Sequence, residues 1–462
     1  MSIFFEDLSN IQQDFSVTKL NKKLNGEVHT DFKLINKMLD LIPQKYFKNP
    51  DLTWLDPCCG RGYFMMALYK RLFSSLSNTF PDSQKRHNHI INNMIHMIEL
   101  NSDYITLLKN IFGEKSNIHN TDFLTFSKKS YNFIIGNPPY NSHQFKKQSN
   151  HTSIWQAFIQ KAFSLLKSRG FLLFITPSIW MKNTHPIFSY MLHHAIQKIH
   201  TMNSLETSRA FRGEAQLPTS YFLIRKSEQH KLSTTVRIYD KTLHKYILYN
   251  TQPLHIHLLT RPTSLPLFAQ SIVQKIQKYV RLYGPISPGN VIKSNIRPER
   301  ITHLDLSTNQ SDKNPYPNIS TCKLNKTKPY LVINYSNIKC PYIEKEKIVL
   351  AHKMYGLPYY DKTGKYGITG RDNFIIINKT SEEFLRLKKF LSSNLFLTLT
   401  EAVRYRMSYL EHNLFDMIPD ITKIPDFPDI ITNTSISTFF RFNKMERNLI
   451  NSHKKTYLLN NI

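Results

Sequence analysis

The chain has 462 residues, a hydrophobic fraction of 41% and an aromatic fraction of 12%. This composition excludes a disordered protein and indicates a globular one with about two or three domains. No apolar run reaches about 18 residues, and the first residues lack the pattern of a signal peptide. We therefore expect no membrane partner and an intracellular location.

The cysteines and the net charge indicate the compartment of the protein and the kind of partner that it binds. Four cysteines, of which Cys58 and Cys59 are adjacent, form neither a disulfide framework nor a zinc pattern, so we expect a reducing compartment and no metal. The net charge of +28 favours a polyanionic partner, most simply a nucleic acid. A lysine-rich proteome, which raises the charge of every protein, is the alternative explanation.

The first predicted helix follows a polar lead-in, residues 1–25. Thr30 or Asp31 can cap a helix that runs toward Pro43. Its predicted apolar face consists of Leu34, Ile35, Met38, Leu39 and Ile42. An ordinary surface helix would have the same pattern, and only its position before the next motif makes it notable.

A glycine turn follows a short strand that ends at Leu55. Residues 53–64 read Thr-Trp-Leu-Asp-Pro-Cys-Cys-Gly-Arg-Gly-Tyr-Phe, and a helix is predicted from about Tyr63 to Phe73. Glycines let the backbone approach a ligand closely at the start of a helix. The spacing matches neither a dinucleotide fingerprint nor a phosphate-binding P-loop. Residues 74–93 are polar and predict a surface insertion.

A second strand, 94–98, ends at Glu99, and a helix is predicted over 103–112. A carboxylate at the tip of this strand is well placed to accept hydrogen bonds from two ribose hydroxyls. A surface glutamate after a strand is the simpler alternative. Asp122 and Phe123 then precede a third strand and are candidates for contact with an adenine amino group and ring.

Residues 131–141 read Tyr-Asn-Phe-Ile-Ile-Gly-Asn-Pro-Pro-Tyr-Asn and place Asn137, Pro138 and Tyr140 on a stiff loop after a buried strand. The Asn137 side-chain oxygen and the Pro138 carbonyl can both accept hydrogen bonds from an amino group conjugated with a ring. They thereby favour its pyramidal transition state. Tyr140 offers a face on which an extruded base can stack. A chance X-Pro-Pro turn is the alternative.

The remaining pattern completes one domain and starts another. A helix is predicted over 153–166, a strand over 171–175, a helix over 187–199 and a late strand over 217–226. Strands alternating with helices indicate a doubly wound parallel sheet. Beyond about 230 the alternation fades, residues 284–329 read as irregular, and strands are predicted over 330–334, 347–350 and 374–377. Thr380 or Ser381 can cap a helix through about Leu391.

A stretch of aromatic and basic residues lies within this second region. Such interleaving suits phosphates and unpaired bases, although a solvated loop is the alternative. The stretch comprises Lys353, Tyr355, Tyr359, Tyr360, Lys362, Lys365, Tyr366 and Arg371.

In this order, the motifs resemble the S-adenosylmethionine-dependent DNA adenine N6-methyltransferases, with the gamma order in which a target-recognition domain follows the catalytic one. The resemblance covers roughly residues 26–228. It implies S-adenosylmethionine as cofactor and a pocket formed by Thr30, Asp56, Cys58, Gly60, Glu99, Asp122 and Phe123. It implies that Asn137, Pro138 and Tyr140 hold the target adenine, and by position alone that Phe211 stacks on its other face. The family often has Pro where this chain has Asp31.

From these patterns we predict a Rossmann-like class I methyltransferase sheet of the α/β class and a second, mixed α+β DNA-recognition domain. The predicted boundaries are 26–228 for the catalytic domain, 229–265 for a linker and 266–462 for target recognition. The expected partner is double-stranded DNA, the expected state a monomer, and no fused nuclease motif stands out. An RNA adenine methyltransferase, a protein glutamine methyltransferase and an inactive nucleic-acid-binding relative are the alternatives.

Overall fold

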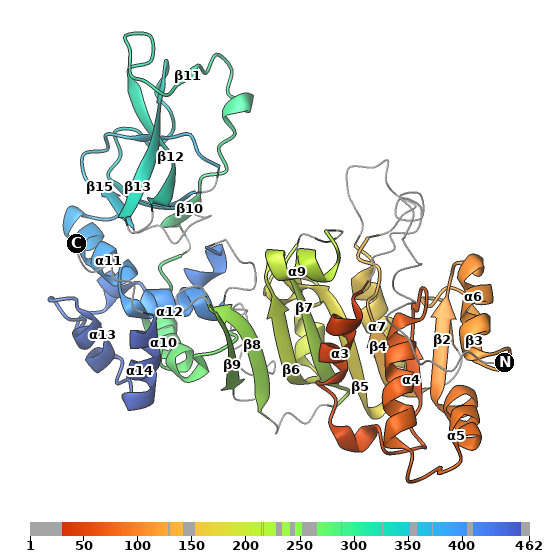
Figure 1. The fold of residues 1–462 in the computed structure, drawn as a ribbon. Coiled ribbons are helices and arrows are strands. Elements are labelled where there is room, and N and C mark those ends of the chain that lie inside the picture. Colours follow the sequence, from red (N-terminus) through yellow and green to blue (C-terminus); the bar gives the residue numbers. More distant parts are fainter. Residues whose placement is uncertain are drawn as a thin grey trace. The chain divides into compact units, whose positions relative to one another are not determined.

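The structure, a computed structural model, describes residues 30–127, 130–141, 153–213, 215, 217–227, 233–240, 245–251, 266–287, 289–325, 328–351, 358–371, 373–403 and 410–453. The predicted lead-in, 1–25, lies outside these residues. The chain divides into two compact units (Figure 1). Unit 1 comprises Met1–Tyr239 with Leu248–Thr260, and unit 2 comprises Asp240–Ile247 with Arg261–Ile462.

In the described part of the chain, unit 1 is organised around a nine-stranded sheet of order β3-β2-β1-β4-β5-β7-β6-β8-β9. Strands β1 to β5 pair in parallel, and β7 is antiparallel to both β5 and β6. The strands are β1 (Trp54–Asp56), β2 (Ile95–Glu99), β3 (Asn117–Asn120), β4 (Tyr131–Gly136), β5 (Leu166–Pro177), β6 (Ala195–Met202), β7 (Thr219–Arg225), β8 (Thr234–Asp240) and β9 (Lys245–Thr251). The predicted α/β class with a mostly parallel sheet is confirmed.

The middle of this sheet is buried because its strands are continuously apolar, as parallel strands covered on both faces must be. An aromatic ladder crosses neighbouring elements on one face. The ring of Trp54 stacks between Phe47 and Phe133 at centroid distances of 5.5 Å and 4.0 Å, and Phe133 stacks on Phe171 at 5.1 Å. Each of these four rings is at most 4% exposed, so the ladder ties β1, β4 and β5 into one core.

Several helices of unit 1 begin at side chains that the sequence offers as caps. Asp31 accepts a hydrogen bond from the Lys33 backbone N–H at the start of the first helix, and the predicted apolar residues Leu34, Ile35, Met38 and Leu39 are buried. The helices and helical turns are α3 (Phe32–Leu39), η1 (Gln44–Tyr46), α4 (Tyr63–Ser75), α5 (Ser83–His89), η2 (Ile90–Met94), α6 (Ser102–Phe112), α7 (Trp155–Leu165), η3 (Ser178–Met181), α8 (Phe188–Leu192) and α9 (Ser204–Ala210).

Two segments differ from the sequence prediction. The helix predicted over 187–199 ends early as α8, and β6 begins at Ala195. Ile196 and Ile199 are at most 3% exposed because β6 pairs with β7 on one side and β8 on the other, and this pairing overrides a short apolar pattern that fits either period. Part of the predicted linker, 229–265, likewise forms β8 and β9 of the sheet.

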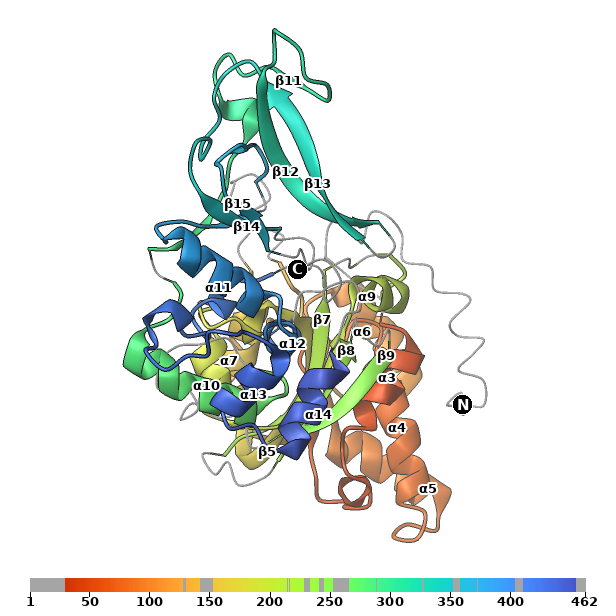
Figure 2. The same cartoon turned by 90° about the vertical axis from the view of Figure 1, so that its left-hand side faces the viewer.

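Unit 2 contains two four-stranded sheets, of orders β10-β17-β14-β15 and β11-β13-β12-β16, in its described residues. β12 and β13 form a long antiparallel ribbon (Figures 1 and 2). The strands are β10 (Val291–Lys293), β11 (Leu306–Ser307), β12 (Tyr316–Asn325), β13 (Lys328–Ser336), β14 (Lys347–Ala351), β15 (Tyr359–Asp361), β16 (Gly367–Ile368) and β17 (Asn373–Ile376). Residues 284–329, predicted to be irregular, thus contain β10, β11, β12 and the start of β13.

The helices of unit 2 gather around a separate apolar core, and Figure 2 shows the last four α-helices of the chain close together. The predicted cap at Thr380 is confirmed, because Thr380 and Glu383 form a reciprocal capping box. The helices and turns are α10 (Gln270–Tyr283), η5 (Pro298–Arg300), α11 (Ser381–Leu391), α12 (Asn394–Ala402), η6 (His412–Leu414), η7 (Ile421–Lys423), α13 (Asn433–Phe439) and α14 (Lys444–Ser452).

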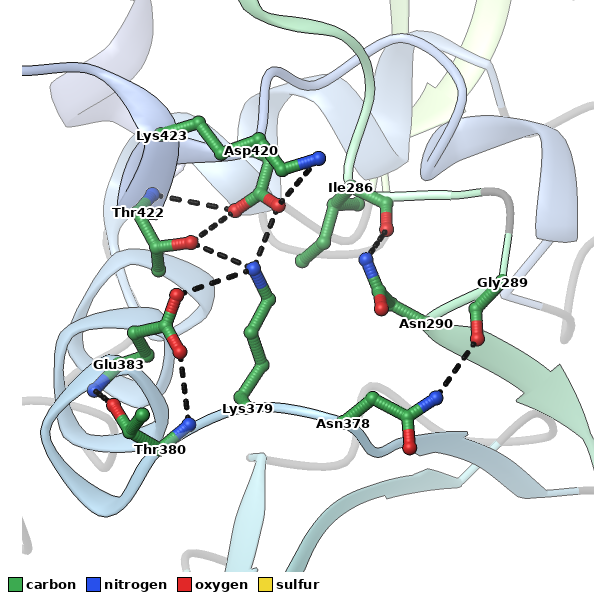
Figure 3. Close-up of polar contacts among 10 residues, drawn as sticks. All are labelled: Ile286, Gly289, Asn290, Asn378, Lys379, Thr380, Glu383, Asp420, Thr422 and Lys423. Carbon is green, nitrogen blue, oxygen red and sulfur yellow. Dashed lines mark hydrogen bonds and ion pairs between the residues drawn. The ribbon is translucent and has the colours of Figure 1, made fainter.

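A charged cluster ties the start of α11 to η7 (Figure 3). The Lys379 ammonium lies 2.7 Å from Asp420 Oδ2 and from Thr422 Oγ1, and 3.5 Å from Glu383 Oε1. Asp420 is wholly buried, so it depends on these donors for its charge to be tolerated. The cluster therefore fixes the path of two segments that are far apart in the sequence.

A close approach of backbones joins β12 to the segment before β17. A Cβ at Gly370 would lie 1.5 Å from the Ser320 carbonyl oxygen, so only glycine fits there. The Asn373 side chain is fully buried and donates to the same carbonyl at 2.9 Å. In the part of the chain that the structure describes, no helix is both long and apolar enough to cross a bilayer.

Candidate active site

Three neighbouring parallel strands end at one edge of the unit 1 sheet, which is where open α/β sheets bind ligands. β1 ends at Asp56, β2 ends at Glu99, and β4 ends at Gly136 immediately before Asn137. The sheet order β2-β1-β4 therefore places the predicted residues of the first three motifs side by side.

In the glycine turn between β1 and α4, the backbone lies close to its neighbours at one glycine and borders open space at the other. Gly62 has φ +82° and precedes the first residue of α4, and a Cβ there would lie 2.8 Å from Leu108 Cδ2 and 3.0 Å from Phe112 Cε2. Gly60 has φ +53°, but a Cβ there would meet no atom within 4 Å. Gly62 is thus required for packing, whereas Gly60 borders open space at the mouth of the site.

Glu99 is held by backbone donors from two sides. Its Oε2 accepts from the Gly60 N–H at 2.7 Å and its Oε1 accepts from the Asn101 N–H at 2.8 Å. The Glu99 carbonyl accepts from the Thr121 N–H at 3.2 Å, which brings the neighbouring Asp122 to the same edge. Asp122 Oδ1 in turn accepts from the Leu124 N–H at 2.8 Å. Glu99 and Asp122 are therefore both held by backbone donors at this edge.

Asp56 is 1% exposed, and its carboxyl lies against β4. A Cβ at Gly136 would lie 2.8 Å from Asp56 Oδ1, and this oxygen accepts from the Cys58 N–H at 3.2 Å. Burial raises the pKa of Asp56 to about 8; the Cys58 hydrogen bond lowers it in part, and the Glu99 charge adds a smaller increase. The Asp56 carboxyl is therefore mostly protonated at neutral pH.

Asn137 is held from two directions. Its Nδ2 donates to Thr30 Oγ1 at 3.2 Å, and its carbonyl accepts from the Cys58 thiol at 3.4 Å. Its Oδ1 is buried and has no hydrogen-bond partner among the described residues. Because buried polar atoms are almost always paired, an unpaired acceptor at a ligand-binding edge indicates a site for a donor. Pro138, next in the loop, is buried.

Tyr140 continues the same loop. Its carbonyl accepts from the Ile154 N–H at 3.2 Å, which anchors the loop to the start of α7. The Tyr140 hydroxyl is buried without a hydrogen-bond partner among the described residues, and burial raises the pKa of this phenol. The Tyr140 phenol therefore stays protonated at neutral pH.

Two predicted aromatic contacts are covered by protein. Phe123 is 2% exposed, and its ring lies 5.3 Å from that of Phe158. Phe211 is wholly buried among the apolar residues of the unit 1 core. A ring without an open face cannot stack on a base, so the prediction that Phe211 stacks on the target adenine does not fit this structure. The sequence position alone suggested that Phe211 stacks on the base, and the burial of its ring argues against this role.

The sequence patterns did not identify two parts of this geometry. Gly136 was read only as the end of a strand, although it makes room for Asp56. The hydrogen bond between Thr30 and Asn137 joins residues from different motifs, and no local pattern could reveal it. The signal that could have revealed the role of Gly136 is a glycine within an otherwise apolar strand.

Comparison with known proteins finds relatives for the part of the chain that contains this edge. The family described as Eco57I restriction-modification methylase matches residues 16–207. An "Uncharacterized adenine-specific methylase" of Mycoplasma pneumoniae (strain ATCC 29342 / M129 / Subtype 1) is 31% identical over 136 residues, which are 27% of this chain and 32% of that protein. The modification methylase CviBIII of Paramecium bursaria Chlorella virus NC1A is 26% identical over 185 residues, 37% of this chain and 44% of that protein.

The chain spans less than half the length of each of these two curated relatives. Among solved structures, the type IIG restriction endonuclease BpuSI is similar with a TM-score of 0.41 at 10% identity, covering 94% of this chain and 67% of that one. The matched family region includes every residue proposed from the sequence for the cofactor pocket and the Asn-Pro-Pro-Tyr loop.

Proposed function

We propose that the protein is a site-specific DNA methyltransferase that transfers a methyl group from S-adenosylmethionine to the N6 amino group of adenine. The observation that carries this proposal is the buried, unpaired Oδ1 of Asn137, held at the carboxyl edge of the sheet by Thr30 and Cys58. An amide oxygen fixed in this way is suited to accept a hydrogen bond from an amino group.

The residues of the edge fit S-adenosylmethionine. When bound, this cofactor supplies an electrophilic methyl group on a positively charged sulfur. The open space at Gly60 admits a ligand close to the backbone, and Glu99 is placed for ribose hydroxyls. Thr30, Asp56, Cys58 and Asp122 complete the proposed pocket.

The Asn-Pro-Pro-Tyr loop acts on the target amine. Asn137 Oδ1 and the Pro138 carbonyl accept hydrogen bonds from the two N6 hydrogens and draw the nitrogen lone pair out of conjugation with the ring. The nitrogen would then accept the methyl group that the bound cofactor supplies, and the extra proton would leave to water afterwards. Tyr140 stacks on the base once it is extruded from the duplex. No strong base is required of the chain.

Unit 2 is proposed to recognise the target. Asp361 organises a turn between β15 and β16, because its carboxylate accepts from the backbone N–H groups of Lys365 and Tyr366 at 3.0 Å each and pairs with the buried Lys347 at 2.6 Å. The turn exposes Lys362 and Lys365 on a fixed backbone. Such a preorganised basic turn suits DNA phosphates. Lys353 and Tyr355, which the sequence grouped with this stretch, lie outside the described residues.

Similarity to restriction-modification methylases supports DNA over the alternatives. An RNA adenine methyltransferase would use the same amine chemistry, and a glutamine methyltransferase could use the same loop. The matched family and the relative named as an adenine-specific methylase favour an adenine base as the acceptor. The net charge of +28 is consistent with a nucleic-acid substrate and is not required for a protein substrate.

Expression in a methylation-free bacterial host, followed by single-molecule sequencing of its DNA, tests this function. We expect N6-methyladenine at one short motif in cells with the wild-type chain and none in cells with Asn137→Ala. The purified variant should still bind S-adenosylmethionine in a calorimetric titration. Equal DNA marks in both strains would reject the role of Asn137. The absence of any mark, with methylation of total RNA by the purified protein, would shift the substrate to RNA.

A further inference from the structure

The connection between β6 and β7 lies at the same edge of the sheet as the candidate active site. Pro177, the last residue of β5, pairs with Thr219 at the start of β7, and Met202 at the end of β6 pairs with the same residue. β5 is parallel to β4, which carries Asn137 at its end. Helix α9 and the turn residues 211–213 that follow it therefore project from the edge that holds Asn137 (Figure 1).

Buried side chains hold this connection in the core of unit 1. Phe211 is wholly buried, and its N–H donates to the Thr207 carbonyl at 3.0 Å. Thr207 is also fully buried and shares a hydrogen bond of 3.1 Å with Thr219 through their hydroxyls. The buried Phe211 ring thus fixes the end of α9 in the core. Exposed positions lie close to Phe211 on both sides in the sequence.

Two arginines occupy those outward positions. Arg209 and Arg212 are exposed, and neither forms an ion pair with any residue that the structure describes. The acidic residue of α9, Glu206, lies 3.5 Å from the guanidinium of Arg237 instead. Arg212 has φ +50°, so its backbone is held in the left-handed conformation that non-glycine residues rarely adopt. Two exposed guanidinium groups that have no ion-pair partner among the described residues, on an anchored turn, are suited to bind anions.

The same connection also exposes apolar surface. Leu205 is 59% exposed and Leu217 is 68% exposed. Exposed leucines beside unpaired arginines are typical of a surface that contacts a macromolecule, because phosphate groups match the guanidinium fork while sugars and base edges cover apolar side chains.

We propose that α9 and the turn residues 211–213 form a DNA-backbone contact element, in which Arg209 and Arg212 bind phosphates of the duplex flanking the target adenine. This inference depends on the proposed function, since it assigns a substrate contact to the same edge. Phe211 has a positioning role in it, and the base itself is left to the Asn-Pro-Pro-Tyr loop. Because phosphates carry no sequence information, this element would contribute equally to binding of any duplex.

The test measures binding of a fluorescent duplex against salt concentration for the wild-type chain and for Arg209→Gln/Arg212→Gln. Each lost phosphate contact lowers the slope of log K against log salt by about 0.9, so the double variant should lower it by about 1.8. Affinity should fall by the same factor for duplexes with and without the methylated motif. An unchanged tryptophan-fluorescence unfolding midpoint establishes that unit 1 is intact.

The chain offers a matched control at the opposite edge of the same sheet. Lys167 and Arg169 are exposed before the apolar run of β5, and Arg169 also has a positive φ, of +62°. Lys167→Gln/Arg169→Gln removes the same two charges and should leave the salt slope unchanged. Equal slope changes in both double variants would indicate a general charge effect and reject the element, as would an unchanged slope in the α9 variant.

The outcomes separate this inference from the proposed function. If the wild-type chain methylates and binds duplex DNA but the α9 variant keeps its slope, only the contact element is rejected. If the wild-type chain neither binds nor methylates duplex DNA, or binds RNA alone, both proposals fail. Restoration of the slope by Arg209→Lys/Arg212→Lys, which keeps both charges, supports a role in phosphate binding.

Discussion

The side-chain amide nitrogen of Asn137 lies 3.2 Å from the hydroxyl oxygen of Thr30, which precedes it by 107 residues in the chain. An asparagine amide has one accepting and one donating end, so a partner for the nitrogen decides where the oxygen points. Since Thr30 takes the nitrogen, the oxygen is the end left for a ligand. The hydroxyl of the first helix region thus orients the amide that we propose to hold adenine.

Replacing Thr30 tests this orientation. Thr30→Val keeps the shape of a side chain that is 5% exposed but removes the hydrogen-bond partner, and one hydrogen bond contributes about 0.5–1.5 kcal/mol. We expect kcat at saturating cofactor to fall roughly two- to tenfold, measured in single-turnover methylation of a duplex. Thr30→Ser keeps the hydroxyl and should retain most of kcat. A change in cofactor affinity alone would indicate that Thr30 serves only the cofactor.

Two substitutions at Tyr140 separate the contribution of its ring from that of its hydroxyl. Base–aromatic stacking contributes roughly 1–3 kcal/mol per base, so Tyr140→Ala should weaken duplex binding or base extrusion by that amount. Tyr140→Phe should behave like the wild-type chain, because the hydroxyl has no hydrogen-bond partner among the described residues. Fluorescence of 2-aminopurine at the target position reports base extrusion. A loss in the phenylalanine variant as large as in the alanine variant would contradict a stacking role.

The raised pKa of Asp56 predicts a pH dependence of stability. Its folded-state pKa of about 8 exceeds the usual value near 3.9, so the folded state binds the proton more tightly than the unfolded one. The stabilisation from this group is complete below pH ~4 and is lost as the pH rises toward 8. Asp56→Asn should remove this dependence, and the difference in unfolding free energy should grow by up to about 1.4 kcal/mol per pH unit in that window.

Tryptophan fluorescence is the measurement for this prediction. All three tryptophans, Trp54, Trp155 and Trp180, are buried in unit 1, so their emission follows the unit that contains Asp56. Other titrating groups are common to both chains and cancel in the difference. Parallel stability profiles of the two chains from pH 5 to pH 8 would show that Asp56 is ionised at neutral pH.

A substitution in unit 2 tests the close approach of its backbones. Gly370→Ala places a Cβ 1.5 Å from the Ser320 carbonyl oxygen, and we expect a loss of more than about 4 kcal/mol in stability. Gly289→Ala is a matched control, because its Cβ meets no atom within 4 Å and only its φ of +87° is unfavourable, at about 1–2 kcal/mol. Hydrogen–deuterium exchange of β12 and β17 measures both effects. Equal protection in the two variants would contradict the packing argument.

The sequence predicted the parts of unit 1 whose signals are local. The cap at Asp31, the glycine turn at Gly60 and Gly62, and the strand that ends before Asn137 all depend on residues close in the chain. Local rules of capping and periodicity describe such elements well. The order of motifs then predicted which edge of the sheet would carry the site, because parallel strands end at one edge.

What was not predictable depends on partners distant in sequence. Ala195–Met202 reads as the end of a helix until β7 and β8 pair with it, and β8 and β9 read as a linker until they extend the sheet. Phe211 matched a family position but is buried by neighbours that no local pattern specifies. The strands within 284–329 are rich in turn-forming residues, which conceal an extended ribbon whose stability comes from pairing.

The partly buried thiol of Cys58, beside the Asn-Pro-Pro-Tyr loop, offers a chemical probe of that loop. Cys58 donates its S–H to the Asn137 carbonyl, and burial raises its pKa well above the ordinary value. Thiolate, the form that alkylating reagents attack, is therefore scarce while this contact is closed. The rate at which an alkylating reagent labels Cys58 should therefore report how often this contact breaks. Binding of S-adenosylmethionine at the edge should slow the labelling.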